Sequence, residues 1–426
     1  MSRFTVEVYQ NEYLPRDGAE VNAIVTVTSS GGDGSGSAPE VAEIVIVDTS
    51  GSMAAPKAKI LAARAATCAA IDCIRDGVAF AVISGYEKAE VVYPYDGGLV
   101  AASEGTRRVA RQAAAGLQAS GGTAMGTWLS LARELFATVP GRVCHAILLT
   151  DGANEHETPE QLKSALARCE GAFQCDCRGV GTDWHVDELR QISSALLGTV
   201  DIIPNPAEMA ADFRAMMQAA MGKATGSVRL RVWTPQGAQL SFVRQVAPTV
   251  EELSDRAAEV NPLTSDYPTG SWGQESRDYH VCIKVPPRNL GDEMLAGRVI
   301  LMEDEERIGQ GLIKAIWTDD EQLSTRISRE VAHYTGQAEL AECIQEGLEA
   351  RKAGDDVTAT DKLGRAVQLA SESGNDGTMK LLQAVVEIVD PGTGTGTVRL
   401  RRDVAAADEM ALDTRSTKTV RVGPAG

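Results

Sequence analysis

The chain has 426 residues, and its 41 Lys and Arg against 59 Asp and Glu give a formal net charge of −18. A chain of this length exceeds the usual size of one domain, so we expect two or three domains with ample apolar cores. The acidic balance argues against nucleic acid or an anionic membrane surface as a general partner.

Two stretches near the N-terminus have the pattern of strands in an antiparallel sheet. They are residues 4–9 and 20–28, and in the second the apolar residues alternate with polar ones. Residues 29–37 consist of Ser, Gly and Asp alone, a composition typical of a flexible linker. We therefore expect residues 1–38 to form part of a first unit that the chain then leaves.

The apolar run of residues 41–47 ends in an acid followed by two hydroxyls at alternate positions. Four consecutive β-branched residues close the run, which is typical of a central parallel strand that is buried on both faces. Asp48 then falls at the carboxyl end of the strand, the edge where ligands bind in open α/β sheets. Ser50 and Ser52 can turn their oxygens toward the same point as Asp48, since Gly51 lets the loop curl.

The spacing of Asp48, Ser50 and Ser52 resembles the DxSxS signature of the von Willebrand factor A (vWA) domain. In that family the signature is part of a metal-ion-dependent adhesion site, which also needs a threonine from a later loop and an acid that ends a later strand. Thr123 stands before a predicted helix, and Asp151 follows another apolar run, so both pieces match in chain order. The resemblance implies that these five residues hold a divalent metal ion.

The resemblance also implies the kind of ion and the kind of partner. We expect Mg²⁺, with Mn²⁺ and Ca²⁺ as alternatives, because Mg²⁺ prefers octahedral oxygen ligands and keeps several waters. Three hydroxyl ligands are neutral and leave most of the charge of the ion uncompensated. In the family the two acids, here Asp48 and Asp151, often act through bound waters, and a Glu or Asp carboxylate of a protein partner takes the sixth position.

Residues 39–221 alternate predicted strands and helices. This pattern is typical of an α/β fold with a doubly wound, mostly parallel sheet of the Rossmann-like type. Beyond residue 221 the pattern becomes that of strands again, predicted at 227–232, 239–246, 277–285 and 293–302.

The two N-terminal strands would be marginal alone, so we expect them to pair with residues 222–320 in one β-sandwich. The vWA domain would then be an insertion in this sandwich, an arrangement that resembles several bacterial vWA proteins.

Helical periodicity returns over residues 321–390, interrupted near Gly354 and Gly374. One helix-turn-helix in this segment faintly resembles a tetratricopeptide unit. No array of such units follows, so we expect a small helical bundle that packs, and not a peptide-binding solenoid.

Residues 391–426 begin with a Gly/Thr repeat and show no apolar periodicity, so we expect a flexible tail. Thr414, Thr417 and Thr419 stand among cations near its end, as in a kinase substrate that a phosphothreonine-reading partner would bind. The alternative is a solvated terminus or a strand added to another sheet.

Three of the eight cysteines, Cys169, Cys175 and Cys177, cluster in the sequence. A zinc site would need a second cysteine pair or histidines at ligand spacing, and His185 is the histidine nearby. Residues 173–179 also fit a sheet strand whose alternate cysteines share one face. We interpret the three as structural thiols, with zinc as the alternative.

An enzyme is the competing interpretation, since Asp, Ser and a divalent ion also occur in hydrolases. The chain has no G-x-S-x-G, Walker A or H-E-x-x-H motif, and Ser50 stands where a DxD phosphotransferase needs a second acid. His145 lies within a predicted strand and is interpreted as a core or surface residue, and His156 as part of the rim around the metal.

We therefore expect a non-enzymatic protein-interaction module in a signalling or assembly complex. The alternatives are a metal-dependent subunit of a chelatase-type ATPase and a metal-dependent hydrolase. No apolar run reaches the roughly 20 residues of a membrane span, and the N-terminal residues do not resemble a secretory signal, so we expect a cytoplasmic location.

Overall fold

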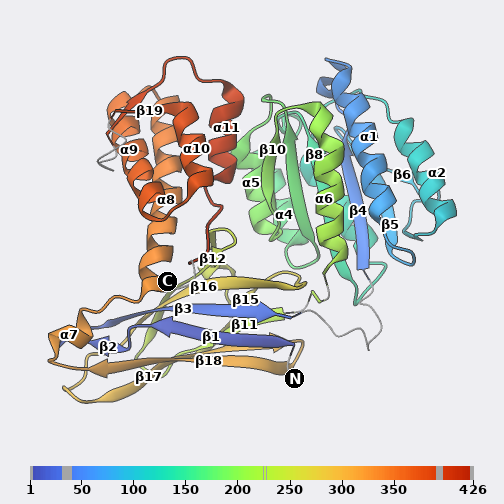
Figure 1. Cartoon of the computed structure of the whole chain (residues 1–426). Helices are drawn as coiled ribbons and strands as arrows, with labels where there is room; N and C mark the ends of the chain where they lie inside the picture. Colours follow the sequence, from blue (N-terminus) through green and yellow to red (C-terminus); the bar gives the residue numbers. More distant parts are fainter. Residues whose placement is uncertain (1–2, 31–40, 224, 227, 390–396, 423–426) are drawn as a thin grey trace. The chain divides into compact units, whose positions relative to one another are not determined.

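The computed structural model describes residues 3–30, 41–223, 225–226, 228–389 and 397–422, which belong to two compact units (Figure 1). One unit spans residues 33–226, and the other combines residues 1–32 with residues 227–426. The α/β unit is therefore an insertion in the chain of the second unit, which contains the β-sandwich and the C-terminal helices. This confirms the predicted fold class.

The inserted unit is built on a seven-stranded sheet in the order β10-β9-β8-β4-β5-β6, with β7 also paired to β5. Its strands are β4 (Val41–Asp48), β5 (Ala79–Gly85), β6 (Ala89–Tyr93), β7 (Val100–Ala101), β8 (Val143–Thr150), β9 (Gln174–Val180) and β10 (Val200–Ile203). All are parallel to their neighbours except β6 and β7, which pair antiparallel with β5. Every residue of the central strand β4 is buried, as its run of β-branched residues predicts.

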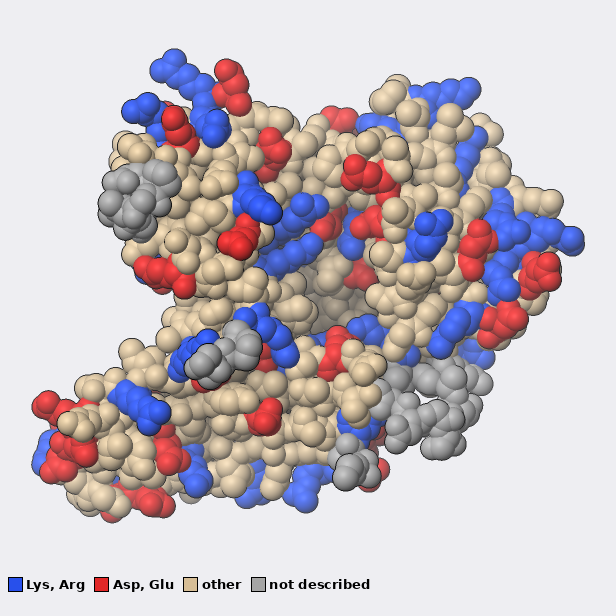
Figure 2. Space-filling model, viewed as in Figure 1, with Lys and Arg blue, Asp and Glu red and all other residues tan. Residues whose placement is uncertain are grey.

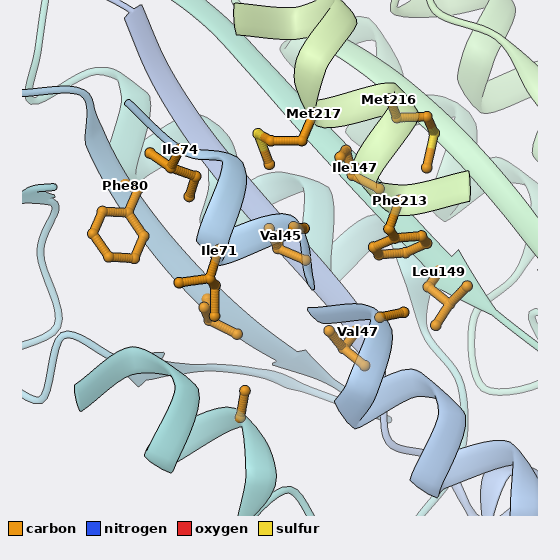
Figure 3. Close-up of a cluster of buried hydrophobic side chains, with 14 of the residues drawn as sticks. Val45, Val47, Ile71, Ile74, Phe80, Ile147, Leu149, Phe213, Met216 and Met217 are labelled. Carbon is orange, nitrogen blue, oxygen red and sulfur yellow. The ribbon is translucent and has the colours of Figure 1, made fainter. Parts of the chain in front are cut away.

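Helices cover both faces of this sheet (Figure 1). They are α1 (Ala58–Cys73), α2 (Glu104–Ala115), α3 (Met125–Phe136), α4 (Pro159–Cys169), α5 (Val186–Ala195) and α6 (Met209–Met221), with short 3₁₀ turns at Gly51–Ala54 and Pro206–Glu208. Residues of α1, α2 and α6 share one core with alternate residues of the strands, and Figure 3 shows Phe213 and Met217 of α6 beside Val45 and Ile147 of that core. On the opposite face, the ring of Trp128 in α3 lies against Gly85 of β5.

The second unit contains a β-sandwich of two sheets, ordered β1-β3-β16-β12-β13 and β14-β15-β11-β17-β18-β2. Its strands are β1 (Phe4–Gln10), β2 (Tyr13–Leu14), β3 (Glu20–Ser29), β11 (Val228–Trp233), β12 (Gln239–Ala247), β13 (Glu251–Glu252), β14 (Ala258–Asn261), β15 (Thr264–Pro268), β16 (Glu275–Lys284), β17 (Glu293–Glu303) and β18 (Glu306–Trp317). The 3₁₀ turn Ser254–Arg256 lies between β13 and β14. β3 pairs with β16, as in the predicted pairing of N-terminal strands with the segment after the insertion. The two sheets are in close contact, because a Cβ added to Gly311 of β18 would stand 2.4 Å from the side chain of Val8 in β1.

The helices after the sandwich are α7 (Glu321–Ser324), α8 (Arg329–Lys352), α9 (Asp356–Glu372), α10 (Asp376–Val385) and α11 (Ala406–Arg415), with a small two-stranded sheet of β19 (Val386–Ile388) and β20 (Val398–Leu400). Side chains of α8, α9 and α10 form one core, as expected for a helical bundle. Acidic and basic side chains are interspersed over the face of each unit that Figure 2 shows.

The prediction of a flexible tail is wrong for residues 398–422. Val398 and Leu412 are buried in the core of the helical bundle, and Thr414 is 1% exposed with its hydroxyl donating to the Met410 carbonyl at 2.8 Å. The Thr419 hydroxyl donates to the Val246 carbonyl at 2.7 Å, so residues near the end of the chain contact the sandwich. These contacts are made by isolated apolar residues and by threonine hydroxyls, without a regular period, which is why the sequence pattern did not reveal them. Residues 391–396 and 423–426 of the predicted tail lie outside the described residues.

Burial removes Thr414 from the predicted phosphothreonine site, and the half-exposed Thr417 and Thr419 are held against the sandwich. Thr414 is inaccessible to a kinase in the folded chain, and Thr417 and Thr419 lie in backbone contact with residues 248–250, Val250 N–H donating to the Thr417 carbonyl at 2.8 Å. Of the alternatives, contact of the segment with another sheet describes these residues better.

Candidate metal centre

The central edge of the inserted sheet brings together the carboxyl ends of β4 and β8. The two strands are adjacent and parallel, with Val47 opposite Leu149, so Asp48 and Thr150 end them side by side. The Thr150 hydroxyl donates to Asp48 Oδ2. Two chain segments that are about a hundred residues apart are thereby joined at the position where ligands bind in open α/β sheets.

The loop after β4 folds back over Asp48. The Ser50 N–H donates to Asp48 Oδ1 at 2.7 Å, a local turn that Asp forms readily. Asp48 is completely buried, and burial raises its pKa to about 6, although hydrogen bonds from Ser50 and Thr150 work in the opposite direction. Both oxygens of this acid are therefore held by donors of the protein.

Asp151 lies next to the two serine hydroxyls. Ser52 Oγ donates to Asp151 Oδ1 at 2.6 Å, and Ser50 Oγ lies 2.9 Å from Ser52 Oγ. Asp151 is completely buried, whereas Ser52 is exposed, so the group opens to solvent on the side of Ser52. The other oxygen of Asp151, Oδ2, lies 2.7 Å from the ammonium of Lys59.

Thr123 reaches the same place from the loop before α3. A Cβ added to Gly152 would stand 3.1 Å from Ser52 Oγ and 3.7 Å from Thr123 Oγ1, so both hydroxyls border this glycine. The loop of Thr123 is fixed to the loop after β4, because Gly51 N–H donates to the Gly121 carbonyl at 2.9 Å. The structure thus brings together all five residues that the sequence singled out.

His156, which the sequence interpretation assigned to the rim around the metal, contacts the backbone of Thr123. Its backbone N–H donates to the Thr123 carbonyl at 2.9 Å, and its ring Nδ1 accepts the Thr123 N–H at 3.3 Å. The ring lies across Gly122, where a Cβ would come within 2.2 Å of it. His156 therefore fixes the backbone of Thr123, whose hydroxyl borders Gly152.

Sequence reasoning missed residues that hold the loops in place. Thr150 and Lys59 contact the two acids, while Asn154 Oδ1 and Glu157 Oε2 accept the N–H groups of Met125 and Gly126, each at 2.8 Å. Thr150 directly precedes Asp151, which is a usable signal. Lys59, Asn154 and Glu157 carry no comparable signal, because their roles depend on how distant loops meet.

The donor set fits a hard divalent cation. Hydroxyl and carboxylate oxygens suit Mg²⁺, Mn²⁺ or Ca²⁺, and sulfur or imidazole donors, which favour zinc or copper, are not among the five residues. When bound, such an ion would supply an electrophilic position for an anionic ligand. Ser50, Ser52 and Thr123 would hold it, with Asp48 and Asp151 next to them.

The other candidate residues lie elsewhere. His145 is in the core, as one of the two sequence interpretations stated, with Nδ1 2.8 Å from Glu43 Oε1 and Nε2 3.0 Å from Asp176 Oδ2. Its strand position is opposite Glu43, five residues before the metal edge of β4. Cys169, Cys175 and Cys177 are buried free thiols, and His185 is exposed, with its Nδ1 3.3 Å from Glu188 Oε1.

The doubly wound sheet and its three loops define a vWA-type domain, and comparison with known proteins agrees. Residues 42–202 match the von Willebrand factor type A domain, and residues 368–416 match the von Willebrand factor type A C-terminal domain. The solved structure of a von Willebrand factor type A protein from Catenulispora acidiphila is 50% identical, with a TM-score of 0.94 over 99% of this chain and 98% of that one. The chain therefore belongs to the von Willebrand factor type A family.

Two further relatives are more distant. The ArnB paralog VWA2 from Sulfolobus acidocaldarius shares the fold, with a TM-score of 0.58 at 12% identity over 99% of this chain and 100% of that one. An uncharacterized protein from Synechocystis is 31% identical over 141 residues, which are 33% of this chain. The match spans about a third (34%) of that relative's length.

Family membership carries general properties. vWA domains are commonly protein-interaction modules, are generally not enzymes, and often bind a divalent metal at the adhesion site. Among the described residues of this chain, none of the helices has the length and apolar character needed to cross a membrane.

Proposed function

We propose that this protein is a non-enzymatic interaction module that binds an acidic side chain of a protein partner through a divalent ion. Asp48, Ser50, Ser52, Thr123 and Asp151 hold the ion, which is Mg²⁺ in the first instance, with Mn²⁺ and Ca²⁺ as alternatives. The partner supplies a Glu or Asp carboxylate, in a cytoplasmic signalling or assembly complex.

The observation that carries this proposal is the way in which the two acids are already engaged. Asp48 accepts from Ser50 and Thr150, and Asp151 accepts from Ser52 and pairs with Lys59. The neutral hydroxyls are thus the groups best placed to contact an ion directly. Neutral ligands leave positive charge on the ion, and a carboxylate from outside is the group that compensates it.

Calorimetric titration of the full chain with Mg²⁺ tests the ion-binding step. We expect Asp48→Asn to weaken binding by about 10–100-fold, as for other residues that orient a metal site. Asp76→Asn is the matched control, since it removes the same charge from a side chain that is 77% exposed and pairs with Arg107, away from the loops. Equal Mg²⁺ affinity in the wild type and Asp48→Asn would remove the metal from the proposal.

Partner binding is tested by co-purification from a native extract with Mg²⁺ or with EDTA. The partner should be retained with Mg²⁺, released by EDTA, and absent from the Asp48→Asn sample. A partner that stays bound in EDTA and to Asp48→Asn contradicts binding through the ion.

A further inference from the structure

Lys59 is a nearly buried cation beside the candidate metal centre. It is the second residue of α1, which follows the loop of Ser50 and Ser52, and its side chain is 9% exposed. Its ammonium lies 2.7 Å from Asp151 Oδ2 and 3.1 Å from Asp183 Oδ2. Asp151 is completely buried and Asp183 is 70% exposed, so the ion pair with Asp151 is the better shielded of the two.

This ion pair changes the charge that the centre offers to an ion. Asp48 and Asp151 together carry two negative charges, and the ammonium of Lys59 compensates one of them. An ammonium 2.7 Å from a completely buried carboxylate forms an ion pair that solvent screens little, so the charge of Asp151 is compensated within the protein. A divalent ion therefore meets one uncompensated negative charge from the protein and keeps an excess positive charge.

We propose that Lys59 lowers the net negative charge of the candidate metal centre. The free protein then binds a divalent ion weakly, and the ion and a carboxylate ligand bind cooperatively. This inference rests on the proposed function, and it assigns to Lys59 the coupling between the two ligands. Lys59 is a positioning residue here, since it acts through Asp151 and contacts neither ligand.

Lys59 has two opposite effects on an ion, and their balance decides the outcome of a substitution. It orients Asp151, which favours ion binding, and it compensates the charge of Asp151, which opposes ion binding. Orientation does not depend on Lys59 alone, because Ser52 also holds Asp151 at 2.6 Å. The charge effect is larger, since a unit charge within several ångströms of a divalent ion at a partly buried site changes its affinity by about tenfold or more.

The test compares Mg²⁺ affinity in the wild type and in Lys59→Met, at one ionic strength, with chloride or acetate as the anion. We expect Lys59→Met to bind Mg²⁺ about tenfold more tightly than the wild type in chloride. Acetate serves as the carboxylate probe. It should strengthen Mg²⁺ binding in the wild type and do so less in Lys59→Met, because linkage makes the coupling reciprocal.

Two further variants separate charge from structure. Lys57→Met removes the same charge from an exposed residue two positions earlier and should leave Mg²⁺ affinity unchanged. Lys59→Gln keeps a hydrogen-bond donor near Asp151 without the charge, so it should also bind Mg²⁺ more tightly than the wild type. It provides the test if Lys59→Met is poorly folded. In EDTA, both Lys59 variants should melt at a lower temperature than the wild type. Mg²⁺ should raise the melting temperature of the variants by more than it raises that of the wild type.

The outcomes distinguish this inference from the proposed function. If the wild type binds Mg²⁺ and neither Lys59→Met nor Lys59→Gln binds it more tightly than the wild type, the inference is wrong and the proposed function stands. If the wild type binds no more Mg²⁺ than Asp48→Asn does, the proposed function fails and the inference fails with it.

Discussion

We expect His145→Gln to destabilise the vWA domain by about 3–5 kcal/mol at pH 7, because it leaves the buried carboxylate of Glu43 and the half-buried carboxylate of Asp176 without their shared cation. The imidazole lies between Glu43 on β4 and Asp176 on β9, at 2.8 and 3.0 Å, and Glu43 is completely buried. Asp176 keeps other partners, since it accepts from the N–H and hydroxyl of Thr199 and feels the charge of Arg178. Glu43 is therefore the acid that the substitution harms most.

The magnitude follows from the pKa of His145. Burial alone would lower this pKa, but the charge of Glu43 and the hydrogen bonds with Glu43 and Asp176 raise it from 6.5 to about 10. At 1.36 kcal/mol per pKa unit, that rise corresponds to about 5 kcal/mol in favour of the folded, protonated form. Burial also raises the pKa of Glu43, which means that its charge is held at a cost, so the net contribution is somewhat smaller.

The same numbers fix the direction of the pH dependence. The folded pKa of His145 lies above its ordinary value of 6.5, so its contribution is complete below about pH 6.5 and is lost as the pH rises through about 10. The difference in stability between the wild type and His145→Gln should therefore shrink between pH 7 and pH 10.

Native-state hydrogen exchange of peptides from β4 and β8 is the appropriate assay, because it reports opening of this domain separately from the sandwich. The control is the double variant Glu43→Gln/His145→Gln, in which the buried charge is removed together with its partner, and which should recover most of the loss. A double variant as unstable as the single one, or a difference that does not change with pH, would refute the electrostatic explanation.

Two other predictions concern packing. Leu412→Ala, in α11, should destabilise the helical bundle by about 2–5 kcal/mol and expose residues 398–422 to limited proteolysis. Asp408→Ala, on the exposed side of α11, should do neither. Equal cleavage of the two variants would instead support the prediction of a flexible tail. Gly85→Ala should lower the stability of the vWA domain by about 1–3 kcal/mol in thermal unfolding, because the new Cβ would stand 2.4 Å from the Trp128 ring. Gly98→Ala is the control and should not lower this stability, because the nearest atom to its new Cβ is 4.0 Å away.

The sequence contained most of the fold and the five candidate site residues, for a physical reason. A buried parallel strand needs a continuous apolar run, and the residue after that run necessarily lies at the ligand edge of the sheet, so Asp48 and Asp151 could be placed from local pattern. Thr123 was found through the family resemblance and not through periodicity. The loops that converge on these residues follow from the order of the strands.

Contacts made by single side chains across the fold could not be predicted in the same way. Nothing in the spacing of Lys59 indicates that its ammonium reaches Asp151, and His145 was not assigned its partners Glu43 and Asp176. The C-terminal segment was missed because Val398 and Leu412 are isolated apolar residues whose burial depends on helices that are distant in sequence. Hydrophobic periodicity reveals the buried face of a helix or strand, whereas these contacts are made by single residues that do not form such a face.

The pairing of β3 with β16 also determines the order in which the chain can fold during synthesis. Ser29 of β3 pairs with Glu275 of β16, and the whole vWA domain lies between them in the sequence. At a synthesis rate of roughly 5–20 residues per second, the 246 residues from 29 to 275 take about 12–50 s to emerge. During this interval β1 and β3 have been synthesised but β16, with which β3 pairs, has not. The inserted domain contains all strands of its own sheet and can fold within this interval.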